Sequence, residues 1–182
     1  MTSAATTVGS MPFSVVSAAM TEIARLLAAN ASYAASRPSV VPDPRPSRRI
    51  AVVTCMDARI DVFAALGLSL GEAHVIRNAG GRVTEDVLRS LALSSHVLGV
   101  DTVVVMQHTK CGLLGVTDDD LRERTGADLG FLAIHDHAVD LRTDVDTLAG
   151  TSFLAPVQRI AGLVYDVETA RVEDVCRWER SG

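Results

Sequence analysis

Two short segments of the sequence carry side chains that bind transition metals in proteins. Cys55 precedes Asp57 by two residues, and His108 precedes Cys111 by three. In an extended chain, side chains at i and i+2 point the same way, and one turn can bring residues at i and i+3 onto one metal. Two thiolates, one imidazole and one carboxylate or water form a tetrahedral set that suits Zn²⁺. Either segment alone could be a buried thiol or a satisfied histidine, but together they predict a metal site.

A parallel sheet would bring the two segments together. Short runs at 50–54, 74–77 and 102–106 predict three strands, and the continuous apolar run at 50–54 suits a strand that is covered on both faces. The apolar rhythm over 84–98 predicts a helix between the last two strands. This alternation predicts an α/β fold with a mainly parallel sheet flanked by helices. Because ligands gather at the carboxyl ends of such strands, the segments that follow the first and third strands should meet there.

The rest of the chain is predicted to surround that sheet. Residues 117–125 and 134–148 are polar and acidic, which indicates surface helices or loops. Residues 162–176 alternate between apolar and polar around a centre at 168–170, which predicts a terminal hairpin.

The N-terminal part of the chain differs in composition from the rest. An Ala-rich stretch at 14–35 has an apolar stripe at helical spacing, and four prolines follow between Pro38 and Pro46. We therefore expect a disordered lead-in at 1–13, an N-terminal helix and Pro-rich arm at 14–48, and one α/β zinc-binding catalytic domain at 49–182.

Composition excludes several classes of protein. The 17 basic and 22 acidic residues give a net charge of −5, which argues against a nucleic-acid partner. No apolar run approaches the roughly 20 residues of a membrane helix. The 3 cysteines are far apart in the sequence, and their number is odd. They therefore indicate a reduced chain and a cytoplasmic location, and the first residues lack the features of a secretory signal.

Three motifs resemble the signatures of the β-class carbonic anhydrases, and most closely those of the small bacterial members. They are CMDAR at 55–59, IRNAGG at 76–81 and HTKCG at 108–112, in matching order and spacing. The resemblance covers about 50–177. It implies one zinc per subunit, held by Cys55, His108 and Cys111. It also implies that Asp57 pairs with Arg59 and, in one conformational state, becomes the fourth zinc ligand.

The resemblance also implies an activity, the reversible hydration of CO₂ to bicarbonate and a proton (a lyase, EC 4.2.1.1). Zinc lowers the pKa of bound water from about 15.7 toward about 7, which supplies hydroxide at neutral pH. The catalytic residues would be Asp57, which orients this hydroxide, and Arg59, which holds Asp57. Asn78, Gly80 and Gly81 would bind the substrate through backbone N–H groups.

The resemblance further implies a homodimer, or a tetramer of two such dimers, with the N-terminal helix packed on the partner. Arg77 and Arg82 are expected to anchor a carboxylate across the interface. Lys110 lies within the third motif, where Asp, Ser or Arg would be more usual, and it could alter the affinity for anions.

Two other functions remain open at this stage. Carbonyl sulfide and carbon disulfide are linear like CO₂, so a hydrolase of either could use the same zinc site. A non-catalytic zinc-binding regulatory module would be expected to lack the Asp57–Arg59 pair, which this sequence retains.

Overall fold

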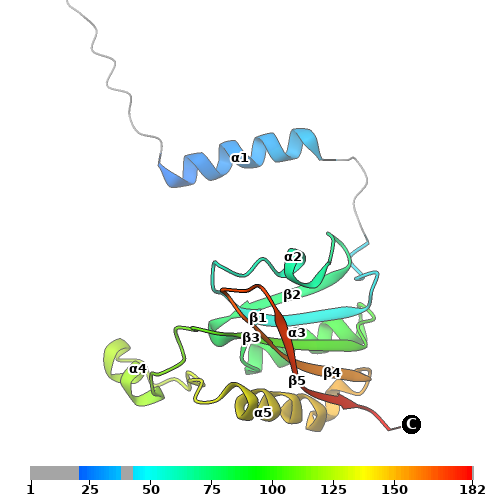
Figure 1. Cartoon of the computed structure of the whole chain (residues 1–182). Coiled ribbons are helices and arrows are strands. Elements are labelled where there is room, and N and C mark those ends of the chain that lie inside the picture. The colour runs from blue at the N-terminus through cyan, green and yellow to red at the C-terminus, as the bar shows by residue number, and fades with distance from the viewer. Residues whose placement is uncertain (1–20, 38–42, 182) are drawn as a thin grey trace, which may run out of the picture. The chain divides into compact units, whose positions relative to one another are not determined.

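The computed structural model describes residues 21–37 and 43–181 (Figure 1). The chain divides into two units, Met1–Val41 and Pro42–Gly182. The predicted lead-in at 1–13 and the first part of the predicted N-terminal helix, 14–20, lie outside the described residues. So do residues 38–42 of the Pro-rich arm.

The described part of the first unit is helix α1, Glu22–Ser36. It begins at Thr21, whose side-chain oxygen accepts a hydrogen bond from the backbone N–H of Ala24 and so caps the helix. None of its residues is buried. Its large apolar side chains lie at helical spacing and are exposed, namely Ile23, Leu26, Leu27 and Tyr33.

The second unit is built on one sheet of five strands in the order β2-β1-β3-β4-β5. The strands are β1 (Ile50–Cys55), β2 (Ala73–Asn78), β3 (Thr102–His108), β4 (Arg159–Tyr165) and β5 (Val172–Glu179). All neighbouring pairs are parallel except β4 and β5, which form the predicted antiparallel hairpin. The α/β fold with a mainly parallel sheet is therefore confirmed.

Helices cover both faces of this sheet. These helices are α2 (Val62–Leu66), α3 (Glu85–His96) and α5 (His137–Gly150). The unit also contains the surface helix α4 (Asp118–Thr125) and the short 3₁₀ turns η1 (Ala79–Gly81) and η2 (Ser152–Leu154). The residues of α3 and α5 pack with Val53 and Val105 in one core cluster. Val62 of α2 packs with Val52 and Met106 in the other. Alternate residues of β1 and β3 thus point to opposite faces of the sheet, and both faces are covered. This explains why the sequences of these strands are almost continuously apolar.

Helices α4 and α5 differ in burial although both lie in polar sequence. Helix α4 buries none of its residues, as expected for a surface helix. Helix α5 buries Leu141, Val145 and Leu148, which recur every three to four residues and pack on the sheet. No helix in the described residues is long and apolar enough to cross a bilayer.

The strand order creates a topological switch point beside β1. From β1 the chain passes to β2 on one side of that strand, and then to β3 on its other side. Connections after β1 and β3 therefore leave in opposite directions, which opens a crevice at their carboxyl ends. The register aligns Thr54 with Met106, so Cys55 and His108 reach this crevice from neighbouring strands.

Candidate metal centre

Three buried side chains form a set of metal-binding donors at the switch point. The ligand atoms of Cys55, His108 and Cys111 all lie within 4.8 Å of one another. Cys55 ends β1, His108 ends β3, and Cys111 lies in the turn that follows β3. The two sulfur atoms are 4.0 Å apart. Of the four metal ligands predicted from the sequence, three belong to this set.

The ring of His108 is oriented as a metal ligand requires. Its Nδ1 lies 2.9 Å from the carbonyl oxygen of Thr109. Because a carbonyl oxygen can only accept, Nδ1 carries a proton, so in the neutral ring Nε2 carries the free lone pair. Nε2 is buried and has no hydrogen-bond partner in the described structure. A buried acceptor without a partner is costly, and a cation bound at this atom would remove the cost.

The thiols also fit a cation. Hydrogen bonding from Cys111, with smaller contributions from His108 and backbone N–H groups, outweighs burial and lowers the pKa of Cys55 to about 4. The same pairing and burial raise the pKa of Cys111. The pair therefore gives up one proton readily and retains the second, since two adjacent buried thiolates repel each other. A divalent cation between them would stabilise both thiolates, and two thiolates with one imidazole are a donor set that favours zinc.

Asp57 and Arg59 form a close ion pair at the rim of this cluster. Arg59 donates from Nε to Oδ1 of Asp57 at 2.9 Å and from Nη2 to Oδ2 at 2.7 Å. The Arg59 guanidinium holds the pKa of Asp57 well below its usual range. Oδ2 of Asp57 also lies 3.7 Å from Nε2 of His108. The carboxylate is thus paired with Arg59 and lies beside the donor cluster.

A cavity of about 360 Å³ opens beside the donors. Its lining combines the donors with small and apolar residues, namely Cys55, Met56, Asp57, Ala79, Gly80, Cys111, Gly112 and Leu113. Such a wall suits a small molecule without charge or strong hydrogen-bonding groups.

The glycine-rich turn after β2 is closed by its own contacts. The side chain of Asn78 donates to the carbonyl of Arg82 and accepts from its N–H. Gly80 lines the cavity, whereas Gly81 packs against the strands. A Cβ on Gly81 would lie 2.9 Å from the backbone nitrogen of Cys55, and φ there is +66°. The structure thus brings Gly80 to the cavity and gives Asn78 and Gly81 contacts that shape the turn.

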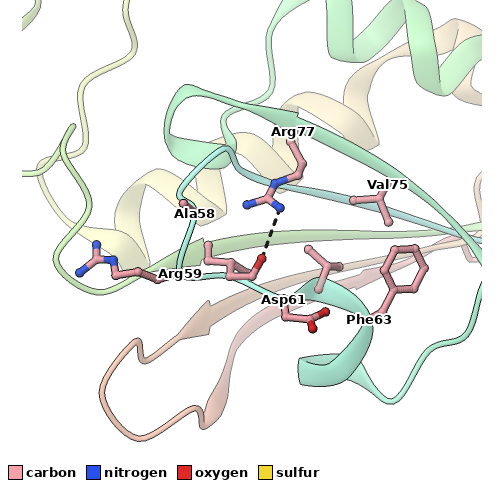
Figure 2. A pocket seen from close by; sticks show the side chains of 8 residues that line it. Ala58, Arg59, Asp61, Phe63, Val75 and Arg77 are labelled. Atoms are coloured by element: carbon pink, nitrogen blue, oxygen red, sulfur yellow. Dashed lines mark hydrogen bonds between the residues drawn. The ribbon is translucent and has the colours of Figure 1, made fainter. Parts of the chain in front are cut away.

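Arg77 supports the loop that carries Asp57. Its guanidinium donates to the backbone carbonyls of Cys55, Asp57 and Ile60. It lies along a second cavity, of about 410 Å³. Figure 2 shows the bond from Arg77 to Ile60 across that cavity, with Arg59 directed away from Arg77.

Arg82 has its carboxylate partner within its own chain. Its guanidinium donates to Asp144 of α5 at 2.7 Å, and both side chains are buried. The expectation that Arg82 reaches a carboxylate across an interface is therefore wrong. Asp144 lies on the buried face of α5, and because a buried carboxylate is unfavourable without a paired cation, Arg82 is held within the chain as its partner.

Other contacts near the site have no signal in the sequence. Gln107 is fully buried, and its Oε1 accepts from Nδ1 of His137 at 2.7 Å. The backbone carbonyl of Lys110 accepts from Nη2 of Arg59 at 3.0 Å. Such contacts depend on where the loops lie in three dimensions, so no spacing rule reveals them.

Known proteins share both the sequence and the fold. A family model described as carbonic anhydrase matches residues 50–146. The chain is 40% identical over 155 residues to β-carbonic anhydrase 1 of Mycobacterium tuberculosis, which covers 82% of this chain and 94% of that protein. It matches the crystal structure of a carbonic anhydrase from Streptococcus mutans with a TM-score of 0.77 and 38% identity, covering 86% of this chain and 99% of the other. It is also 39% identical over 89 residues to a carbon disulfide hydrolase from Acidianus, which covers 49% of this chain and 42% of that protein.

Proposed function

The chain belongs to the β-carbonic anhydrase family, and we propose that it catalyses the reversible hydration of CO₂ to bicarbonate and a proton. One observation carries this proposal. The buried donors Cys55, His108 and Cys111 lie beside a carboxylate that an arginine holds, and the same cavity has an apolar wall. A metal activates water at such a site, and the wall accommodates the apolar reactant.

Cys55, His108 and Cys111 would hold one zinc ion per subunit. When bound, zinc supplies a Lewis acid that lowers the pKa of water. The lone pair on Nε2 of His108 and the two thiols support this assignment. A cytoplasmic location is consistent with it, because metal-binding thiols must stay reduced.

Asp57 would accept a hydrogen bond from the attacking water and turn its lone pair toward CO₂. Its lowered pKa keeps it ionised at neutral pH, so it acts as an acceptor. Arg59 holds both carboxylate oxygens and thereby keeps Asp57 away from the donor cluster. Without Arg59, the carboxylate would be free to take the fourth position on the metal, as the resemblance implies for one conformational state.

Gly80, with Asn78 and Gly81, would form the substrate-binding wall. Gly80 supports this role by lining the cavity, while Asn78 and Gly81 hold the turn in which it lies. The absence of a side chain at Gly80 leaves room for Leu113, whose Cδ1 would be 2.8 Å from a Cβ at this position.

The protein would form a homodimer in which α1 of each subunit packs on its partner. Ile23, Leu26 and Leu27 of α1 are each more than half exposed, and such a stripe normally packs on another surface. A dimer could pair further into a tetramer, with CO₂ and bicarbonate as the small-molecule partners.

A carbon disulfide hydrolase is the second candidate. The similarity to the Acidianus enzyme favours it, but that match covers less than half of either chain. The match to the mycobacterial β-carbonic anhydrase covers most of both. A carbonyl sulfide hydrolase would need the same site. A non-catalytic zinc module is disfavoured because Asp57 and Arg59 are both present and paired, as the proposed mechanism requires.

Stopped-flow CO₂ hydration, with zinc content measured on the same preparation, tests the proposal. The wild-type chain should hold close to one zinc and hydrate CO₂ faster than it consumes carbon disulfide or carbonyl sulfide. Arg59→Ala and Asp57→Ala should retain zinc and lose most of the activity. Full activity in Arg59→Ala with zinc bound would contradict the role assigned to the pair. Faster turnover of carbon disulfide than of CO₂ would favour the second candidate.

A further inference from the structure

The turn between β4 and β5, residues 166–171, holds the backbone that follows His108. The N–H of Thr109 donates to the carbonyl of Tyr165 at 2.9 Å. The N–H of Val167 donates to the side-chain oxygen of Thr109 at 3.1 Å. One residue further, Nζ of Lys110 lies 2.5 Å from a carboxylate oxygen of Glu168. Two consecutive residues of the metal-binding loop are thus fixed to the same turn.

The backbone carbonyls of Thr109 and Lys110 point to different parts of the site. The carbonyl of Thr109 accepts from Nδ1 of His108 at 2.9 Å, which fixes the orientation of the ring. The carbonyl of Lys110 accepts from Nη2 of Arg59 at 3.0 Å. Lys110 has φ +55°, a left-handed conformation that a residue with a side chain seldom adopts. The strain at Lys110 is tolerated because contacts on both sides of the backbone hold it there.

The turn itself is well defined, so it can act as a support. The carboxylate of Asp166 accepts from the N–H groups of Glu168 and Thr169, at 2.8 and 2.7 Å. The N–H of Ala170 donates to the carbonyl of Asp166 at 2.9 Å, and the N–H of Asp166 donates to the carbonyl of Arg171 at 2.8 Å. The backbone at Glu168 is therefore fixed by bonds that do not involve the metal-binding loop.

We propose that Thr109 and Lys110 are positioning residues for the reaction, and that the β4–β5 turn sets the direction of their two carbonyls. Thr109 acts on the metal through His108, and Lys110 acts on Asp57 through Arg59. Neither residue touches the reacting atoms. This inference rests on the proposed function, because it assigns these residues a role toward the zinc ligand and the Asp57–Arg59 pair.

Thr109 is tested by removing one oxygen. Thr109→Val keeps the shape of the side chain but leaves the N–H of Val167 without its acceptor, whereas Thr109→Ser keeps the acceptor. The rate at which a chelator removes zinc should rise in Thr109→Val, by less than the roughly tenfold that a lost partner of a metal ligand costs, because the carbonyl that accepts from His108 is kept and only its support is lost. Thr109→Ser should release zinc at close to the wild-type rate. This rescue separates positioning from a general loss of stability.

The role of Lys110 is tested by a surface substitution at its ion-pair partner in the turn, Glu168, which leaves the fold intact. Glu168→Gln removes the charge that pairs with Lys110, and Glu173→Gln is the matched control, since it makes the same charge change at an exposed position of β5. The pair is more than half exposed, so we expect kcat for CO₂ hydration to fall about two- to fivefold in Glu168→Gln alone. The ¹⁵N resonance of Arg59 Nε should also shift in that variant.

The results that overturn the inference differ from those that overturn the proposed function. Zinc release unchanged in Thr109→Val, or kcat and the Arg59 resonance both unchanged in Glu168→Gln, would refute the positioning role. A wild-type chain that binds no zinc or hydrates no CO₂ would refute the proposed function instead. The Arg59 resonance needs no turnover, so it reports on Lys110 in either case.

Discussion

Replacing Gly81 by Ala should damage both the stability of the fold and the metal site. Gly81 has φ +66°, and a Cβ on it would lie 2.9 Å from the nitrogen of Cys55 and the carbonyl carbon of Thr54. It would also lie 3.0 Å from the carbonyl oxygen of Met106. These are backbone atoms at the ends of β1 and β3, so they cannot rotate away. The added methyl group must push apart the two strands that position the metal ligands.

The size of the effect follows from two contributions. An alanine with positive φ costs about 1–2 kcal/mol relative to glycine. Forcing an extra carbon into a packed region costs about 1–3 kcal/mol more. The free energy of unfolding should therefore fall by about 2–5 kcal/mol. Gly99→Ala is the matched control, because Gly99 has φ +78° but nothing lies within 4 Å of its added Cβ. It should lose only the first contribution, about 1–2 kcal/mol.

Urea unfolding of the zinc-free proteins measures the difference between the two variants, and titration with zinc measures the site. Gly81→Ala should be less stable than Gly99→Ala and should bind zinc more weakly, because the nitrogen of Cys55 is among the atoms displaced. Equal loss of stability in the two variants, with wild-type zinc affinity in both, would refute the argument that Gly81 lies too close to the strands for a side chain.

Three further predictions concern the metal, the pH and the N-terminal helix. Cys111→Ser should lose zinc on dialysis, whereas Cys176→Ser, far from the donors in sequence, should retain it; full occupancy in the first variant would remove Cys111 from the ligand set. Burial lowers the pKa of His137 below its ordinary value of 6.5. The unfolded chain therefore binds the proton more readily than the folded chain, so the free energy of unfolding should fall as the pH drops from 6.5 toward the lowered pKa. Unfolding of zinc-free His137→Gln at pH 7.5 and 5.5 should therefore show a smaller loss than wild type, and an equal loss would contradict this. Deleting the residues before Pro46 should dissociate or aggregate the protein in sedimentation, since the stripe on α1 would be gone; an unchanged dimer would show that the helix is dispensable.

Much of the fold could be predicted because it depends on local sequence. The β-branched runs that became β1 and β3 are buried on both faces, so their sequences are almost entirely apolar and easy to recognise, whereas β2 at the edge of the sheet is only partly buried. Helix α3 starts at a capping residue, Thr84, and follows a clear apolar period. The buried face of α5 was harder to see, because Asp144 interrupts it and accepts its hydrogen bonds from Arg82 and from the N–H of Val83, about 60 residues away in the sequence.

The chemistry of the candidate site could be predicted from residue types and their spacing. Cys55, His108 and Cys111 are recognisable from residue type and from their place directly after strands, and the order of the strands brings them together. The orientation of these groups, in contrast, depends on contacts made in the folded chain. The carbonyl of Thr109 that fixes His108, the carbonyl of Lys110 that holds Arg59, and the close approach of Gly81 to β1 all involve backbone atoms. Every residue type presents a backbone carbonyl, so the partners of the carbonyls of Thr109 and Lys110 depend on the path of the chain in space and leave no mark in the sequence.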